Sequence, residues 1–162
     1  MNKLENKIDF VVFFTVSGAN PNGDPLNDNM PRIDYDGFGE ISDVCIKRKI
    51  RNRMQDMGHG IFVQANDRID DDFKSLESRF KGEFGSVKGL QDNEIVEQCC
   101  SKWMDIRSFG QVLTYQKLSL GVRGPVSISL GKSLNPVDTI SMQITRSTNG
   151  MQAAEGKSRS SD

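Results

Sequence analysis

Residues 42–58 constrain the fold most, because they carry the start, the period and the end of a single amphipathic helix. Ser42 or Asp43 can cap the free N–H groups of the first turn, and Gly58 suits the position just past the last turn. Four apolar residues recur at helical spacing and are expected to face a core: Ile46, Ile50, Met54 and Met57. The pattern therefore predicts one helix that packs through one face.

The rest of this helix surface is strongly cationic. Lys47 comes one turn before Arg51, and Lys49 comes one turn before Arg53, so like charges are stacked along the helix. Such stacking costs helix stability. A helix that accepts the repulsion favours an anionic partner, and phosphate is the commonest partner of clustered Lys and Arg. The alternative interpretation is a face that is only solvated.

Composition narrows the class of protein. The chain has 162 residues, enough for one domain, and its formal net charge of -1 means that the cationic character is local. Its three cysteines lack the spacing of metal ligands, and its only histidine is His59, so we expect reduced thiols, a cytoplasmic protein and no metal or other cofactor. No apolar run approaches the roughly 20 residues that span a bilayer, so no membrane partner is expected.

A strand and a shaped loop are expected before the basic helix. Residues 8–16 are almost continuously apolar, with β-branched and aromatic side chains, which predicts a strand in the middle of a sheet. Residues 17–25 contain Gly, Asn, Asp and two prolines, which favour successive tight turns. This loop is either a connector or a ledge of backbone N–H groups and Asn side chains beside a ligand.

Two helices are expected in the middle of the chain. Apolar residues at helical spacing predict a helix over residues 67–81, and residues 82–89 read as a glycine-punctuated connection. Asp92 is expected to cap a second helix that continues to Trp103. The stripe of Ile95, Cys99 and Trp103 is expected in the core, because nothing polar converges beside it.

The last part of the chain alternates as strands do. Residues 122–130 and 139–145 each place apolar side chains on one face and small polar ones on the other, so we expect antiparallel neighbours around a loop that contains Asn135 and Pro136. The polar face lacks aromatic residues that stack on bases, which favours holding of a nucleic-acid backbone over base recognition. Arg107 lies beside Ser108, Phe109 and Gly110, a neighbourhood of small residues that would let a phosphate approach closely, which alone is weak evidence for a phosphate contact.

Several segments together resemble one family. Residues 20–25, 29–34 and 42–52, followed by residues 105–112 and 122–126, are similar to the Cas-seven backbone subunit of type I CRISPR Cascade complexes, most nearly that of subtype I-C. The similarity spans about residues 7–146. It implies an α+β fold, with an RNA-recognition-motif-like (ferredoxin-like) antiparallel sheet and a helical insertion at about residues 59–104.

The resemblance also implies a function and partners. Subunits of this family pack side by side along CRISPR guide RNA, which pairs with the target DNA strand, and they contact other Cascade subunits. In type I systems the family is non-catalytic, so no enzyme activity is expected. Related type III subunits cut RNA with an aspartate in the loop after the first strand.

The end of the chain departs from the family pattern. Residues 147–162 are polar and rich in Gly and Ser, and are expected to form a flexible tail. Members of the family continue for roughly as much again. We therefore expect residues 1–146 to form a partial palm domain that is incomplete at its C-terminus, as a fragment or as a naturally shortened copy.

Three functional hypotheses follow. The first is an RNA-holding backbone subunit whose guide-binding residues are Asn20, Asn22, Lys47, Arg48, Lys49, Arg51, Arg53, Arg107 and Arg123. The second is a shortened copy that inhibits or regulates assembly of Cascade. The third is a metal-dependent ribonuclease that uses Asp24 or Asp34, which the type I resemblance disfavours.

Overall fold

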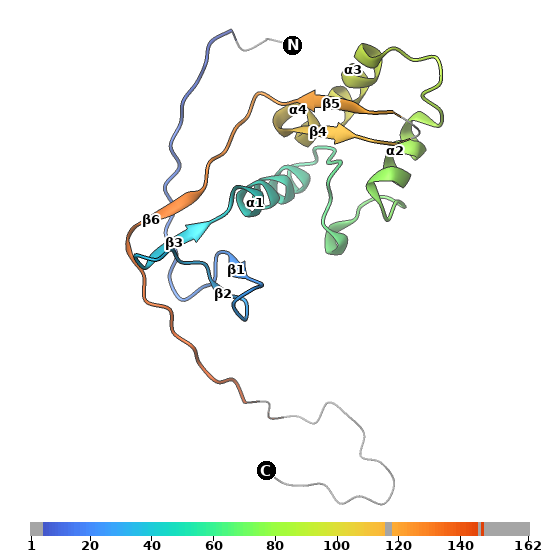
Figure 1. Ribbon diagram of the computed structural model, residues 1–162. Coiled ribbons are helices and arrows are strands. Elements are labelled where there is room, and N and C mark those ends of the chain that lie inside the picture. The colour runs from blue at the N-terminus through green and yellow to red at the C-terminus, as the bar shows by residue number, and fades with distance from the viewer. Residues whose placement is uncertain (1–4, 116–117, 146, 148–162) are drawn as a thin grey trace, which may run out of the picture.

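The computed structural model describes residues 5–115, 118–145 and 147 (Figure 1). Its strands and helices follow the order β1 (Gly23–Asp24), β2 (Met30–Pro31), β3 (Phe38–Ile41), α1 (Asp43–Asp56), a 3-10 turn (Asn66–Arg68), α2 (Leu76–Phe84), α3 (Asp92–Lys102), α4 (Met104–Phe109), β4 (Gly110–Leu113), β5 (Leu120–Arg123) and β6 (Gly131–Pro136). This mixture confirms the predicted α+β class. None of the helices in the described residues is long and apolar enough to cross a membrane.

The strands pair into three antiparallel sheets of two strands each, β1 with β2, β3 with β6, and β4 with β5. The β3–β6 pair joins distant parts of the chain, since Ile41 lies opposite Gly131. Helix α1 starts directly after β3 and leads away from this pair toward α2, α3, α4 and the β4–β5 hairpin (Figure 1). Helix α1 therefore connects the β3–β6 pair to the helical part of the molecule.

The hydrophobic core lies among α2, α3, α4 and β4. Its fully buried side chains are Phe62, Phe80, Ile95, Cys99, Trp103, Ile106 and Leu113. The Phe62 and Trp103 rings lie 4.7 Å apart in a tilted arrangement. Each large apolar side chain buried here contributes roughly 1.5–3 kcal/mol. The predicted core stripe on α3 is confirmed.

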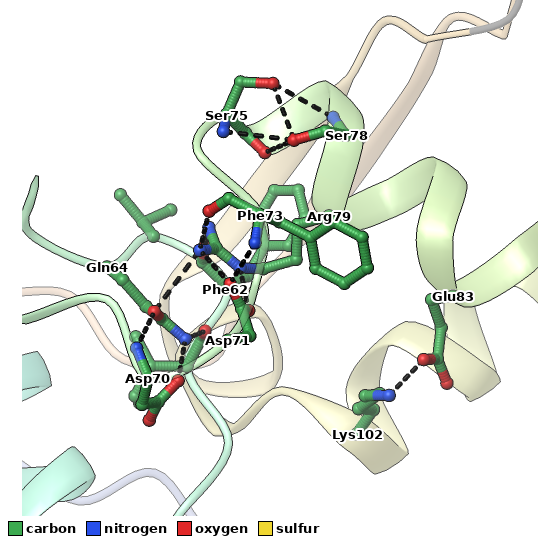
Figure 2. A network of polar contacts seen from close by, with 12 residues as sticks. Phe62, Gln64, Asp70, Asp71, Phe73, Ser75, Ser78, Arg79, Glu83 and Lys102 are labelled. Atoms are coloured by element: carbon green, nitrogen blue, oxygen red, sulfur yellow. Dashed lines mark hydrogen bonds and ion pairs between the residues drawn. The ribbon is translucent and has the colours of Figure 1, made fainter.

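The first predicted middle helix was placed too early. Helix α2 begins only after Ser75, whose hydroxyl accepts the Ser78 N–H while the Ser78 hydroxyl accepts the Ser75 N–H (Figure 2). The preceding aspartates are used in irregular structure: Asp71 accepts the Phe73 N–H at 3.0 Å. The helix then runs to Phe84, through part of the expected connection.

The second middle helix agrees with the prediction apart from its cap. Gln91, not Asp92, is the N-cap residue, and it exchanges hydrogen bonds with Glu94 in a capping box. The helix ends at Lys102, one residue before Trp103. The range predicted as a helical insertion, residues 59–104, thus contains α2 and α3.

The predicted strands at both ends are wrong. Residues 8–16 are in no strand, and their large apolar side chains are exposed. The segment at 122–130 is split: its first residues belong to β5, the next ones form no strand, and Asn135 and Pro136 lie in β6 instead of a loop. Residues 139–145 are also in no strand. A strand needs a hydrogen-bonded neighbour, and no described segment pairs with residues 8–16 or 139–145. Apart from Ser147, the predicted tail lies outside the described residues.

Candidate nucleic-acid interface

Helix α1 forms as the sequence predicts. The Ser42 hydroxyl accepts the Cys45 N–H at 3.3 Å, and Gly58 takes a left-handed conformation (φ +83°) just past the C-cap. No residue of α1 is fully buried, so its apolar residues pack with one side only. Met57 is exposed, because it lies at the C-cap beyond the packed turns.

The two loop asparagines predicted to bind RNA are used within the protein. The Asn22 side-chain oxygen accepts hydrogen bonds from the Ser42 N–H (2.8 Å) and the Ser42 hydroxyl (2.9 Å). The Asn20 amide donates to the Asn29 carbonyl at 2.8 Å. Both side chains therefore tie the loop together and to the start of α1. This geometry supports the connector interpretation of the loop.

Arg51 faces the protein interior. Its Nε donates to Asp105 Oδ2 at 3.0 Å, and the Asp105 side chain is 1% exposed. The other contacts of Asp105 are to backbone, since its oxygens accept the N–H groups of Phe62 (2.8 Å) and Val63 (3.0 Å). The guanidinium also lies 5.1 Å from the centre of the Phe109 ring. Arg51 therefore holds the fold, as the partner of a buried carboxylate.

Arg48 also contacts the segment that contains Phe62 and Val63. Its guanidinium donates to the Val63 carbonyl at 2.7 Å. Burial and the neighbouring Arg51 charge lower the pKa of Arg48, although a guanidinium stays charged at neutral pH. Arg48 is thus a second structural cation on α1.

A third arginine also stabilises the segment of residues 62–64 through hydrogen bonds. Arg79 is buried and donates to the Phe62 carbonyl at 2.8 Å, to the Phe73 carbonyl at 3.0 Å and to both oxygens of Asp71 (Figure 2). Phe62 lies in a buried segment without regular structure, whose peptide groups need partners. Charged side chains supply these partners, since Arg79 donates to the Phe62 carbonyl and Asp105 accepts the Phe62 N–H.

Two other cations of α1 point to solvent. Lys49 and Arg53 are exposed, and neither side chain has a hydrogen bond or ion pair with another described residue. With 3.6 residues per turn, Lys49 is rotated about 200° from Lys47. The two pairs of like charge that the sequence suggested therefore lie on different sides of the helix.

Lys47 borders an open hollow of about 600 Å³ between α1 and the end of α4. The lining residues are Lys47, Phe109, Gly121, Val122, Arg123, Gly124, Val126 and Ser127. Lys47 forms a half-buried pair with Asp43 at 3.2 Å, one turn earlier, and lies 6.0 Å from the Phe109 ring centre. Two predicted site residues, Lys47 and Arg123, thus meet at one hollow.

Glycines allow the backbone at this hollow to pack closely. A side chain on Gly124 would meet the Ser108 carbonyl at 2.3 Å, and one on Gly110 (φ +77°) would meet the Val122 carbonyl at 2.3 Å. The Val126 N–H also donates to the Ser108 carbonyl at 2.9 Å. The small residues around Arg107 therefore serve strand packing. Arg107 itself is exposed on α4 and is not among the residues that line the hollow.

Two residues of this region were not predicted from the sequence. Asp105 orients Arg51, and the signal was a single carboxylate between Trp103 and Ile106, both core residues. Phe109 lines the hollow, and the signal was an isolated aromatic residue between small ones.

The two aspartates of the ribonuclease hypothesis have partners inside the protein. Asp24 pairs with Arg32 at 3.4 Å. Asp34 accepts the Phe38 N–H at 2.9 Å and pairs with Lys132 at 2.5 Å, and these hydrogen bonds lower the pKa of Asp34. No group of three or more His, Cys, Asp or Glu residues that could hold a metal ion occurs in the described part of the chain.

The amino-acid sequence matches a family of known proteins. The family described as "CRISPR-associated protein Cas7" matches residues 6–161. A protein of Haloferax volcanii with the same description is 29% identical over 151 residues, which cover 82% of this chain and 44% of the relative. The chain thus spans less than half the length of this curated relative. Because the family match extends over nearly the whole sequence, the chain belongs to the Cas7 family of CRISPR-associated proteins.

Proposed function

We propose that this chain is an RNA-binding backbone subunit, or the N-terminal portion of one, of a type I Cascade complex nearest to subtype I-C. It holds guide RNA through phosphates, so that the guide bases stay available to the target DNA strand. Its partners are guide RNA, copies of itself and other Cascade subunits, in a cytoplasmic ribonucleoprotein. Family membership supports the CRISPR-associated role.

The hollow beside α1 is the observation that carries this proposal. Lys47 and Arg123 approach it from separate elements, and an added Cβ at Gly121 would meet no atom within 4 Å, so a phosphate can come near the backbone there. The half-buried pair of Lys47 with Asp43 joins neighbouring turns of one helix and contributes little stability, so Lys47 can exchange it for a phosphate at small cost. Two cations converging on one open hollow favour a polyanion.

Contacts to phosphate are favoured over contacts to bases. Phe109 is the one aromatic residue in the lining, and Arg51 already lies 5.1 Å from its ring centre. Sequence-independent holding of single strands relies on such cationic grooves. Lys49 and Arg53 lie on the other side of α1, and we assign them to a solvated face.

Reversal of one charge in the hollow tests the site. Arg123→Glu should sharply weaken binding of single-stranded RNA in a filter or polarisation assay, because it places a carboxylate against phosphate. Lys81→Glu is the matched control, since Lys81 is an exposed cation on α2 outside the hollow. Equal losses in both variants would show a general charge effect and reject the hollow as the site.

We also propose that the chain does not cut RNA. Asp24 and Asp34 are engaged by Arg32 and Lys132, and His59 is exposed at the end of α1. Labelled RNA should remain intact with the protein and Mg²⁺ or Mn²⁺. Cleavage that disappears in Asp24→Ala or Asp34→Ala would replace this proposal with the ribonuclease hypothesis.

A further inference from the structure

One aromatic ring contacts two cations of α1. The centre of the Phe109 ring lies 6.0 Å from the Lys47 ammonium and 5.1 Å from the Arg51 guanidinium. Lys47 and Arg51 are one turn apart on the helix, where like charges repel each other. A ring that attracts both cations offsets part of this repulsion. Phe109 therefore favours an arrangement in which both side chains stay close to it.

The Arg51 part of this contact is fixed by the fold. Arg51 Nε donates to Asp105 at 3.0 Å, and the side chains of Arg51 and Asp105 are 12% and 1% exposed. The Asp105 carboxylate also accepts the N–H groups of Phe62 and Val63. Movement of the guanidinium would leave a buried carboxylate without its ionic partner, which is costly. The Phe109 ring therefore lies against a firmly held group.

The Lys47 side chain is more covered than its ion pair explains. Lys47 pairs with Asp43 one turn earlier, as Lys81 on α2 pairs with Glu77 one turn earlier. The Lys47 side chain is 25% exposed, whereas the Lys81 side chain is 50% exposed. The difference agrees with the Phe109 contact, because a lysine stem lies along apolar surface while its ammonium stays in water.

We propose that Phe109 is a positioning residue of the hollow beside α1, and that Lys47 is the residue that it positions. This inference rests on the proposed RNA-binding function. The ring holds the Lys47 side chain at the hollow before RNA binds, and keeps this contact when a phosphate replaces Asp43 as the partner of the ammonium. Less side-chain freedom is then lost on binding, which strengthens the phosphate contact.

Replacement of the ring tests this role in a polarisation assay with labelled single-stranded RNA. Phe109→Leu keeps an apolar side chain but removes the ring, and should weaken binding about two- to tenfold, the effect of leaving one long side chain unordered. Phe109→Tyr keeps the ring and should retain the wild-type affinity. Urea unfolding checks that each variant is folded.

Phe38→Leu is the matched control for loss of a ring beside a lysine. The centre of the Phe38 ring lies 4.9 Å from the Lys132 ammonium, and neither residue lines the hollow. Phe38→Leu should therefore bind RNA as the wild type does. Equal losses in Phe109→Leu and Phe38→Leu, or equal losses in Phe109→Leu and Phe109→Tyr, would overturn the proposal.

A double-mutant cycle separates positioning of Lys47 from direct contact between Phe109 and RNA. In the Lys47→Ala background, Phe109→Leu should cause no further loss, because no lysine remains to be positioned. In the Arg123→Ala background, Phe109→Leu should cause the same loss as in the wild type. Equal losses from Phe109→Leu with and without Lys47 would show that the ring binds RNA itself, and would overturn the positioning role.

The same variants distinguish failure of this inference from failure of the proposed function. A loss of RNA binding in Lys47→Ala without a loss in Phe109→Leu would overturn the positioning role and leave the hollow as the RNA site. Unchanged binding in both Lys47→Ala and Arg123→Ala would reject the hollow itself, and the positioning role with it.

Discussion

The two sides of α1 carry the same kind of residue for different purposes. Toward the helical part of the molecule, Arg48 and Arg51 bind a backbone carbonyl and a buried carboxylate. Toward solvent, Lys49 and Arg53 have no partner among the described residues. Some cations of α1 therefore stabilise the fold, and only the others remain available to bind a ligand.

The difference follows from what each side chain loses on leaving water. A buried carboxylate without partners is very costly, so Asp105 requires Arg51 and the two peptide N–H groups. The exposed cations stay hydrated, so they have no such desolvation cost, and no partner fixes their side-chain geometry. Replacements on the two sides should thus differ in size and in kind.

The largest effect is expected at Asp105. Asp105→Ala removes the partner of Arg51 and leaves two buried N–H groups unpaired, and should lower the free energy of unfolding by about 3–5 kcal/mol. Urea unfolding measures this. Asp43→Ala, which breaks the half-buried pair with Lys47, should change the free energy of unfolding by less than about 1 kcal/mol. Similar values for the two variants would contradict the assignment of Arg51 as structural.

A smaller loss is expected at Arg79. Arg79→Lys keeps the charge but cannot reproduce the fork that reaches Asp71, Phe62 and Phe73, so stability should fall by about 1–3 kcal/mol. Lys81→Arg on the same helix is the exposed control. If Arg79→Lys were as stable as the wild type in urea, the buried segment would not depend on that geometry.

The Asp71 carboxylate gives this support a pH dependence. Its hydrogen bond with Arg79 lowers the pKa of Asp71 below the ordinary value of 3.8. The stabilisation is complete above pH 3.8 and is lost as the pH falls through the lower folded-state pKa, because the unfolded chain takes up the proton first. The stability difference between wild type and Asp71→Asn should therefore shrink in acid. A constant difference over that range would refute the effect.

The smallest effect on stability is expected on the solvent side. Lys49→Ala with Arg53→Ala removes a like-charge pair one turn apart, so the free energy of unfolding should stay the same or rise by up to about 0.5 kcal/mol. Thermal or urea unfolding measures the change. A loss above about 1 kcal/mol would mean that these side chains support the fold.

Much of the local structure could be predicted because it depends on nearby residues. The cap at Ser42, the apolar period of α1 and the core stripe of α3 are all set within a few turns. The start of α2 was misplaced because side-chain hydrogen bonds of Asp70 and Asp71 competed with helix formation. Sequence period alone does not show that competition.

Partners distant in sequence could not be predicted. Asp105 is 54 residues from Arg51, so nothing near α1 distinguishes Arg51 from Arg53. The strand patterns of residues 8–16 and 139–145 describe what each segment can do, but a strand also requires a neighbour. The meeting of Lys47 with Arg123 at the hollow likewise depends on the packing of α4 and β5 against α1.

The most direct test compares two double variants that remove equal charge. The salt dependence of RNA binding should fall in Lys47→Ala with Arg123→Ala, by about 0.7 in log–log slope for each lost phosphate contact. It should be nearly unchanged in Lys49→Ala with Arg53→Ala. The same loss in both, or a loss only in the second, would contradict the claim that the hollow beside α1 is where this chain holds RNA.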